Sequence, residues 1–426
     1  MLDMKLIREN PDIIKKDLQK RDRPDLIKKL DEVRELDVLW RESLQKTEDF
    51  KRQRNVLSKE IAELKKQDKD ASEKLSLVKE IPIKIKQEEE KTLTIKEKID
   101  IIRFDIPNIL HESVPVGIDD TQNKEEKVWG KKPSPDFEIK SHVDLLEEFD
   151  LADTKKASEV AGKRFYYLKN ELVMLDFALQ KFALDILYKK GFILVQPPLM
   201  LRKSSYDTMV SMGDFEEVMY KIDDEDLYLI ATSEHPLGVY HLNETVDAKK
   251  LPLKYAGISP CFRKEVGSHG KDTKGIFRVH NFNKIEQFVF CRPENSWKIH
   301  EEITANAEEI FQKLELPYHI VNVCTGDMGG IASKKYDIEV WMPGQQKYRE
   351  VVSSSNCTDY QARRLNTKYE EHGKRQLVHT LNSTAIATSR VIVAIMENLQ
   401  NKDGSFNVPK ALMPYMNGIK VIGTKK

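Results

Sequence analysis

The sequence has 426 residues, of which 33% are charged and 40% are hydrophobic. A chain of this length is expected to form two or three domains, and its charged fraction exceeds the ~25% that is typical of globular proteins. Lysine plus arginine equals aspartate plus glutamate at 70 each. This balance excludes a general basic field, so any binding of nucleic acid must depend on local patches. No apolar run approaches the ~18 residues that a membrane span requires.

The N-terminus and the cysteines indicate a cytoplasmic protein. Asp3 and Glu9 lie near the start without an apolar block, so we expect neither a signal nor a transit peptide. The few cysteines are typical of a reducing compartment. They are widely spaced and form no C-x-x-C pair, so no zinc cluster is expected from them, and we interpret them as buried small residues. They are Cys261, Cys291, Cys324 and Cys357.

Residues 26–104 are expected to form an antiparallel helical hairpin. They contain one proline and no glycine, and apolar residues recur at steps of three or four, as in a coiled coil. The pattern fades at the polar cluster 67–72, where the chain can turn. Pro82 lies in the second helix and is expected to kink it. The expected seam comprises Leu26, Leu30, Val33, Leu36, Trp40, Leu44, Phe50, Leu57, Ile61 and Leu64, then Leu75, Val78, Ile85, Ile95, Ile99 and Ile102.

The composition of this hairpin leaves its partner open. Its charges nearly balance, so a solvated coiled coil for protein association fits as well as an arm that binds nucleic acid. A locally basic run leads to the tip, and it suits phosphate contact or a solvated face equally. The run consists of Lys51, Arg52, Arg54, Lys59, Lys65, Lys66 and Lys69.

We expect three parts in the chain: the arm over 1–106, a linker over 107–139 and a globular domain over 140–426. Prolines and Gly117 mark loops in the linker. In the globular part, residues 172–190 are typical of an amphipathic helix that ends at Gly191, and further helices are expected near 297–315 and 388–400. Short apolar runs at 227–230, 253–258, 285–291, 318–323, 336–342 and 348–352 indicate strands. Because most of them follow one another without helices between, the sequence predicts an α+β fold with an antiparallel sheet.

The stretch 262–286 contains the densest chemistry. It is expected to form a strand, a polar loop rich in glycine and a second strand. Arg263 and Arg278 could both face a polyphosphate, because a guanidinium binds phosphate oxygens in pairs, and Phe282 could cover a base. The alternative is a charged hairpin with arginines at the surface. No G-x-G-x-x-G or Walker A loop occurs, which counts against Rossmann and P-loop folds.

This stretch resembles motif 2 of the class II aminoacyl-tRNA synthetases. Its pattern, F-R-x-E-x-G-S-x-G-x-D-T-x-G followed by R-x-H-x-F-x-K-x-E, is similar to that of the seryl-tRNA synthetase family. Four further stretches resemble the same family in order and spacing. They are 191–198, similar to motif 1 with its proline at Pro197; 232–234, similar to the T-x-E loop; 350–353, similar to the E-x-x-S strand; and 381–390, similar to motif 3.

The resemblance covers nearly the whole chain and implies an enzyme. It implies a class II antiparallel sheet core flanked by helices, with a coiled-coil arm that contacts the long variable arm of serine tRNA. The implied reaction joins L-serine to ATP as seryl-adenylate and transfers the serine to the 3′ end of tRNA(Ser), with Mg²⁺ accompanying ATP. A homodimer through motif 1 around Pro197 is also implied. The tripeptide 232–234 and the arm resemble the common zinc-free type, and charging of selenocysteine tRNA stays open.

The resemblance also implies residue roles. Arg263, Arg390 and Glu350 are the expected catalytic residues. Arg263 binds the α-phosphate and the serine carboxylate, while Arg278 and Arg390 hold the outer phosphates. Glu350 and Ser353 hold Mg²⁺, a hard ion that prefers oxygen ligands. Glu265 accepts the adenine amino group and Phe282 stacks on the ring. The implied ATP contacts are completed by Lys264, Val279, Val351 and Val352, and the serine contacts by Thr232, Ser233, Glu234, Glu286 and Thr384, together with Arg263.

Other interpretations are weaker. His269 and His280 could carry protons, but loop conformation or strand packing explains them better. Val352 and the tripeptide 383–385 depart from the usual bacterial pattern without changing a chemical group that the roles require. A homologue that loads amino acids onto carrier proteins would lack the long arm. A scaffold that has lost catalysis would be expected to lose Arg263 or Arg390, and both are present.

Overall fold

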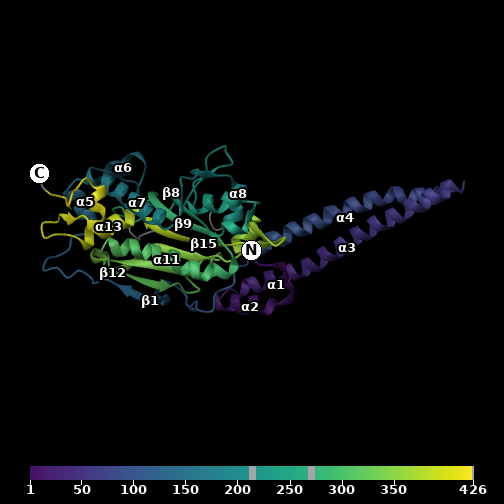
Figure 1. Cartoon of the computed structure of the whole chain (residues 1–426), viewed down its shortest axis with the longest axis horizontal. Coiled ribbons are helices and arrows are strands. Elements are labelled where there is room, and N and C mark those ends of the chain that lie inside the picture. The colour runs from purple at the N-terminus through teal and green to yellow at the C-terminus, as the bar shows by residue number, and fades with distance from the viewer. Residues whose placement is uncertain (211–216, 267–273, 425–426) are drawn as a thin grey trace. The chain divides into compact units, whose positions relative to one another are not determined.

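A computed structural model describes residues 1–210, 217–266 and 274–424, so His269 and the loop around it lie outside the described residues. The chain divides into two compact units, Met1–Ile109 and Leu110–Lys426 (Figure 1). Within the described residues, no helix is both long enough and apolar enough to cross a membrane.

The first unit is a helical arm. Its long helices α3 and α4 lie side by side as an antiparallel hairpin (Figure 1), which confirms the prediction from the heptad-like pattern. At 1.5 Å per residue, their 43 and 34 residues span about 65 and 51 Å. Pro82 lies inside α4, which continues on both sides of it. The helices of this unit are α1 (Met4–Glu9), α2 (Pro11–Lys20), α3 (Pro24–Lys66) and α4 (Ser72–Asp105).

The middle of the arm seam is polar, which the sequence analysis did not predict. Ser43 and Thr47 are buried, whereas Leu44, which we expected in the seam, is 37% exposed. The Ser43 hydroxyl lies 2.8 Å from both a Glu88 carboxylate oxygen and the Thr92 hydroxyl. These hydrogen bonds satisfy the small polar side chains, so they can replace bulky apolar residues between the helices.

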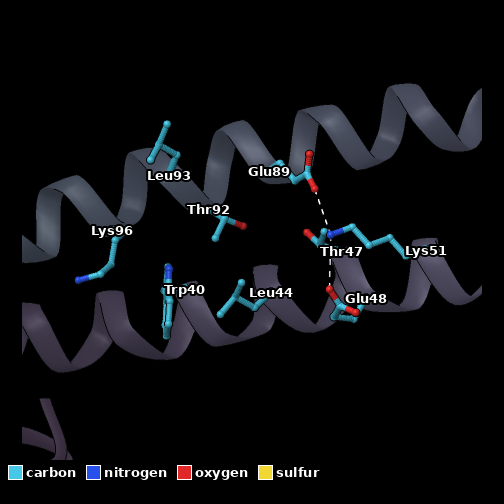
Figure 2. A pocket seen from close by; sticks show the side chains of 9 residues that line it. All are labelled: Trp40, Leu44, Thr47, Glu48, Lys51, Glu89, Thr92, Leu93 and Lys96. Carbon is cyan, nitrogen blue, oxygen red and sulfur yellow. Dashed lines mark hydrogen bonds and ion pairs between the residues drawn. The ribbon is translucent and has the colours of Figure 1, made fainter. Parts of the chain in front are cut away.

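The displaced apolar side chains line a hollow on the surface of the arm. Trp40 and Leu44 from α3 and Leu93 from α4 surround a volume of about 290 Å³ (Figure 2). At its rim the Lys51 ammonium lies 3.1 Å from Glu89 and 3.5 Å from Glu48. The charge of this lysine is therefore balanced locally. The other lining residues are Thr47, Thr92 and Lys96.

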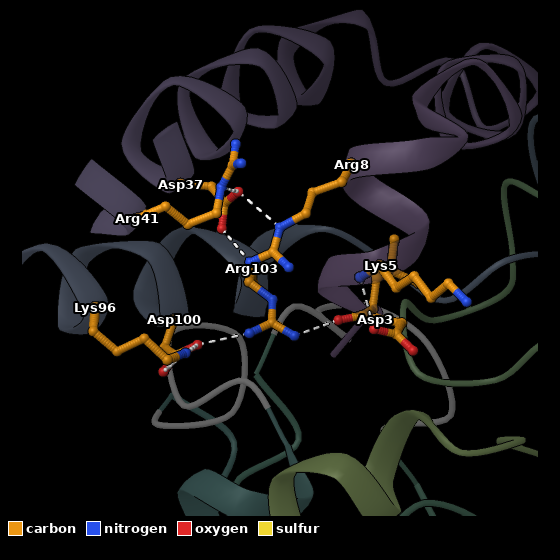
Figure 3. A network of polar contacts seen from close by, with 9 residues as sticks. Asp3, Lys5, Arg8, Asp37, Arg41, Lys96, Asp100 and Arg103 are labelled. Carbon is orange, nitrogen blue, oxygen red and sulfur yellow. Dashed lines mark hydrogen bonds and ion pairs between the residues drawn. The ribbon is translucent and has the colours of Figure 1, made fainter. Parts of the chain in front are cut away.

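A polar network ties the short helices to the long ones at the base of the arm (Figure 3). Arg8 of α1 donates two hydrogen bonds to the buried carboxylate of Asp37, at 2.6 and 2.8 Å, and Arg41 approaches the same group at 3.1 Å. Arg103 of α4 bonds Asp100 and the backbone carbonyl of Leu2. The bidentate pair gives a defined geometry that a single lysine contact would not impose.

The second unit is built on an eight-stranded sheet in the order β1-β10-β11-β12-β15-β9-β8-β4. Every neighbouring pair is antiparallel except β4 and β8, which confirms the predicted α+β class with an antiparallel core. In that order the strands are Lys124–Trp129, Tyr318–Asn322, Lys334–Met342, Lys347–Asn356, His379–Ala387, Asn281–Cys291, Leu253–Phe262 and Ile193–Val195. The sequence analysis gave no strand to segment 107–139, yet β1 of this segment pairs with β10 at the sheet edge.

Helices α7 (Glu171–Lys189), α11 (Ser296–Lys313) and α13 (Thr388–Asn398) pack on one face of the sheet. Alternation along β9 divides its side chains between the two faces. Ile285 and Val289 belong to the large core that these helices cover, and Phe288 belongs to a second cluster on the opposite face. Glu286 has the same parity as Phe288, so it lies on the face away from these helices.

The remaining short elements complete this unit. They are α5 (His142–Glu148), α6 (Thr154–Val160), α8 (Lys203–Met209), α10 (Glu234–Gly238), α12 (Tyr360–Leu365), β2 (Ala152–Asp153), β3 (Tyr167–Leu168), β5 (Met200–Leu201), β6 (Tyr228–Leu229), β7 (Thr245–Asp247), β13 (Lys368–Glu371), β14 (Lys374–Leu377), β16 (Phe406–Asn407) and β17 (Val421–Ile422), with the 3₁₀ turns Asp120–Gln122, Val239–His241, Ala248–Lys250, Pro293–Asn295, Pro343–Gln345 and Lys410–Tyr415.

Candidate active site

Arg263 directly follows β8 and is held by backbone and side-chain contacts. Its Nε donates to the carbonyl of Ala231 at 3.2 Å, and its guanidinium lies 5.3 Å from the ring centre of Phe282. Its backbone N–H donates to the carbonyl of His280 at 2.8 Å, and the His280 ring contacts the Arg263 carbonyl at 2.8 Å. His280 thus supports the strand geometry, as its structural interpretation predicted.

Glu265 and Arg278, which both lie between β8 and β9, pair with each other. Arg278 donates to the Glu265 carboxylate at 2.9 Å, and Glu265 has a left-handed backbone with φ of 51°. The Glu265 carbonyl accepts a hydrogen bond from Arg164 at 3.2 Å. The backbone N–H of Lys264 donates to the Val218 carbonyl, and Val279 is buried. An ATP contact by Glu265 or Arg278 would therefore require this ion pair to open or to share its partners.

A β-bulge in β12 places Glu350 and Ser353 on one face. Residues three apart on a regular strand point to opposite faces. In β12, however, Val352 pairs with Ile338 and Glu350 pairs with Glu339, so Val351 is an extra residue. This insertion restores a common direction for the two oxygen-bearing side chains. Val351 and Val352 are themselves buried.

Arg390 lies in the first turn of α13 and contacts this bulged strand. Its Nη1 donates to the Glu350 carbonyl at 2.6 Å and lies 3.5 Å from the Glu350 carboxylate. Partial burial opposes ionisation of Glu350. The cations Arg390, Lys335 and Arg263 outweigh this effect and lower the pKa of Glu350 to about 2. The carboxylate is therefore ionised throughout the neutral range.

Residues that the sequence analysis assigned to serine lie on the neighbouring strands β15 and β9 and in the segment 232–234, where α10 begins. Thr384 of β15 pairs with Glu286 of β9, which pairs with Gly257 of β8. The Thr384 hydroxyl donates to Glu286 at 3.3 Å, and the Ser233 hydroxyl donates to the Gly257 carbonyl at 3.3 Å. A β-bulge directly after Thr384 shifts the register of β15, so the alternation of side chains between the two faces changes there.

Glu234 begins α10 and completes this polar pocket. Its backbone N–H donates to the Thr232 hydroxyl at 3.1 Å, and its carboxylate accepts from Asn382 at 3.0 Å and Gln361 at 3.4 Å. Burial, followed by the nearby charge of Glu286, raises the pKa of Glu234 to about 7. The pocket thus holds two close carboxylates, one of which titrates near neutrality.

Glu350 and Ser353 fit a magnesium ion only in part. Both supply oxygen, the donor that Mg²⁺ prefers, and the low pKa of Glu350 keeps it charged. Among the described residues, no group of three or more histidine, cysteine, aspartate or glutamate side chains could form a metal cage. Two ligands from one strand suit an ion that takes its other ligands from phosphates and water.

Sequence reasoning missed three residues of the serine pocket. Lys284 forms an ion pair with Glu286, and Gln361 and Asn382 donate to Glu234. Lys284 could have been found from its spacing, because residues two apart on a strand share a face. Asn382 lies inside the motif 3 stretch and needed only the same argument. Gln361 is on α12, and no pattern in the sequence pointed to it.

Comparison with known proteins agrees with this geometry. Residues 218–399 match the model of the tRNA synthetase class II core domain (G, H, P, S and T), and residues 1–110 match that of the seryl-tRNA synthetase N-terminal domain. A serine–tRNA ligase of Methanocella arvoryzae is 52% identical over 425 residues, which cover 99% of this chain and 100% of the relative. The chain belongs to the seryl-tRNA synthetase family.

Two solved structures of seryl-tRNA synthetases share the architecture. The enzyme from Pyrococcus horikoshii, complexed with ATP, is 51% identical with a TM-score of 0.96, and the similarity covers 100% of both chains. The cytoplasmic enzyme from Naegleria fowleri, in complex with AMP, is 36% identical with a TM-score of 0.91, covering 100% of this chain and 99% of the other. The family resemblance inferred from the sequence is therefore confirmed.

Proposed function

We propose that the chain activates L-serine with ATP as seryl-adenylate and transfers the serine to the 3′ end of tRNA(Ser). The observation that carries this proposal is the meeting of three groups on one sheet: Arg263, the Glu350–Arg390 pair, and the pocket formed by Glu234, Glu286 and Thr384. Full-length relatives that are serine–tRNA ligases support it.

In the first step, the serine carboxylate attacks the α-phosphate and pyrophosphate leaves. This displacement needs alignment and charge neutralisation more than a protein base. Arg263 is placed to bind both reacting anions, because its guanidinium lies beside Phe282, the proposed stacking partner of adenine. Arg390 and Arg278 supply fixed positive charge for the leaving phosphates. Lys264, Glu265, Val279, Val351 and Val352 complete the proposed nucleotide contacts.

Glu350 and Ser353 would hold Mg²⁺ together with the phosphates of ATP. When bound, the ion would neutralise charge on the phosphate oxygens. Arg390 positions Glu350 for this role, since it donates to the Glu350 carbonyl and lies beside its carboxylate. The serine ammonium would be received by Glu234 and Glu286, while Thr232, Ser233 and Thr384 shape the pocket around the hydroxyl.

In the second step, a ribose hydroxyl at the tRNA end attacks the seryl carbonyl and releases AMP. We assign the recognition of tRNA to the arm, residues 1–106, and the chemistry to residues 140–426. Of the basic residues predicted to contact tRNA, Lys51 is paired with Glu48 and Glu89, and Arg52, although 75% exposed, lies 3.8 Å from Asp49. Within the described residues, Arg54 forms no ion pair, and neither do Lys59, Lys65, Lys66 and Lys69 toward the tip. These cations are therefore the stronger candidates for phosphate contact.

We propose that two copies pair through motif 1. The edge strand β4 exposes Ile193 and Leu194, and Phe177 and Tyr188 project from α7 with 65% and 68% exposure. Exposed apolar groups around an open sheet edge are typical of an interface. Leu194→Glu should shift sedimentation from dimer to monomer, whereas Val160→Glu, at an exposed apolar site on α6, should not. A dimer that survives Leu194→Glu would contradict this assignment.

We also propose that the protein is cytoplasmic, and the substrate proposal has a direct assay. All four cysteines are buried and none belongs to a disulfide among the described residues, which suits a reducing cytoplasm. The decisive assay offers purified enzyme and ATP with labelled serine to tRNA(Ser), and in parallel to a carrier protein that ends in a phosphopantetheine thiol. Serine should be transferred to the tRNA alone. Transfer to the thiol in preference to the tRNA would overturn the proposed function in favour of a carrier-loading enzyme.

A further inference from the structure

A buried lysine stands inside a pocket that has to receive an ammonium group. The Lys284 Nζ lies 2.5 Å from Oε2 of Glu286, and the two side chains are 7% and 2% exposed. Within the described residues, Lys284 forms no other ion pair. A buried ion pair is no more stabilising on average than apolar residues of the same volume. Stability alone therefore gives little reason for a cation at this position.

The hydrogen bonds of Glu286 show what the lysine does to the carboxylate. Oε2 receives both the Lys284 ammonium and the Thr384 hydroxyl, the latter at 3.3 Å. Within the part of the chain that the structure describes, the polar contacts of the Glu286 carboxylate thus converge on Oε2. The other oxygen, Oε1, is left to accept hydrogen bonds from a substrate.

The charges of the pocket can be counted from these contacts. The charge of Glu286 opposes ionisation of Glu234, and the charge of Lys284 acts on Glu234 in the opposite sense. A bound ammonium favours the ionised form of both carboxylates, and two ionised carboxylates with one lysine leave a net charge of −1. A serine ammonium, whose carboxylate pairs with Arg263, brings this charge to zero. A substrate with a second ammonium would place one cation too many beside Lys284 in a site of low dielectric.

We propose that Lys284 is a specificity-determining residue that orients Glu286 and restricts the pocket to amino acids with a single ammonium group. The compound that it would exclude most directly is L-2,3-diaminopropionate, in which an amino group replaces the serine hydroxyl at nearly the same size. Repulsion between like charges is an established means of rejecting a wrong partner. This inference rests on the proposed function and names how the serine pocket selects its substrate.

The test compares serine with L-2,3-diaminopropionate in ATP–pyrophosphate exchange, at a mildly acidic pH at which both amino groups of the analogue are protonated. The variants are Lys284→Met and Lys284→Gln, which remove the charge, and Lys284→Arg, which retains it. The matched control is Lys254→Met, because Lys254 pairs with Glu302 at 2.5 Å outside the pocket. The measured quantity is the ratio of kcat/KM for the analogue to kcat/KM for serine.

Wild type, Lys284→Arg and Lys254→Met should show the same low ratio. Lys284→Met should raise it by about tenfold or more, with serine kcat/KM itself reduced, since a repulsive contact between like charges is removed. Lys284→Gln can still hydrogen-bond Glu286 and should raise the ratio as well. If the methionine variant does not fold, the glutamine variant provides the test. An unchanged ratio in the folded glutamine variant would overturn the inference. Failure of wild type to exchange with serine would instead overturn the proposed function.

Discussion

At the scale of single residues, Arg390 is held by contacts with two other segments of the chain. It reaches from the first turn of α13 to the bulged strand β12 and keeps one guanidinium nitrogen on the Glu350 carbonyl. The same guanidinium lies 5.2 Å from the ring centre of Phe277. Packing and hydrogen bonding thus fix a cation beside Glu350, where we propose that negative charge develops during adenylate formation. Fixed charge of this kind is worth most in a site closed to water.

Arg390→Ala should reduce serine-dependent pyrophosphate exchange roughly 30- to 1000-fold, the range for losing ~2–4 kcal/mol of transition-state stabilisation. Exchange kinetics at saturating serine would measure this loss. Arg292→Ala is the control, because Arg292 directly follows the last residue of β9 and its guanidinium pairs with Glu371 at 2.8 Å. Near-normal exchange by a folded Arg390→Ala protein would show that Arg390 does not contact the nucleotide.

Glu286→Gln should affect serine more than ATP. The neutral amide can no longer pair with the substrate ammonium, so the KM for serine should rise, or kcat/KM fall, more than about tenfold. The KM for ATP provides the internal control, and both constants come from the same exchange assay. If the ATP constant moves and the serine constant does not, Glu286 belongs to the nucleotide site.

Much of the candidate site could be predicted from residue order, because motif 2 and motif 3 keep fixed spacings. Of the missed residues, Gln361 could not have been found from the sequence, for a physical reason. Gln361 acts on Glu234 from a helix 127 positions away in the chain, and only the fold brings the two together. Likewise, the pairing of Glu265 with Arg278 depends on a left-handed backbone at Glu265, a conformation for which a glutamate gives no signal.

At the scale of elements, the spacing of apolar residues predicted the positions of helices better than it predicted which side chains meet between them. The period of the arm correctly gave two helices and a turn, but it placed Leu44 in the seam where Ser43 is buried. A step of three or four residues cannot decide between adjacent positions once polar side chains satisfy each other across the seam. The two bulges were equally hidden, because an extra residue in a strand leaves its composition unchanged.

The base of the arm should be sensitive to Asp37. Burial opposes its charge, yet the hydrogen bonds from Arg8 and the charges of Arg8 and Arg41 lower the pKa of Asp37 below its ordinary value. Its contribution to stability is therefore complete above the unfolded pKa near ~3.9 and is lost as the pH falls toward the lower folded value. Asp37→Asn should lower the free energy of unfolding of fragment 1–109 by roughly 1–2 kcal/mol at neutral pH, discounted for the partial exposure of Arg8.

Urea unfolding of the fragment, followed by circular dichroism at neutral and acidic pH, measures this effect. The difference between wild type and Asp37→Asn should shrink in acid. Asp25→Asn is the control, because Asp25 also accepts two hydrogen bonds from an arginine, Arg23, but both side chains are exposed. An effect of Asp25→Asn as large as that of Asp37→Asn would refute the role of burial at the arm base.

At the scale of the whole molecule, the chain forms two units, and the proposed functions fall on different ones. The unit 110–426 contains every residue proposed for adenylate formation, and the unit 1–109 contains the exposed cations proposed for tRNA. Composition alone could separate these units, since the arm is charged and free of glycine over 26–104. It could not show that β1, drawn from the expected linker, completes the catalytic sheet, because a single edge strand has little pattern of its own.

Shortening the arm should separate the two activities. Replacing residues 42–94 by a short turn keeps the Arg8–Asp37 and Lys96–Asp100 pairs. Pyrophosphate exchange with serine should stay within a few-fold of wild type, whereas charging of tRNA(Ser) should fall by orders of magnitude. The intact enzyme should also show a steep salt dependence of tRNA binding that the shortened one lacks. Equal charging by the two proteins would assign the arm to another partner.

The central claim is that this site activates serine and no other standard amino acid. The most direct measurement is ATP–pyrophosphate exchange by the intact chain with Mg²⁺ and each of the twenty amino acids in turn. Serine should give exchange at least about tenfold above any competitor, since a pocket built to hydrogen-bond a hydroxyl rejects analogues that lack it. Faster exchange with another amino acid, or none with serine, would contradict the account.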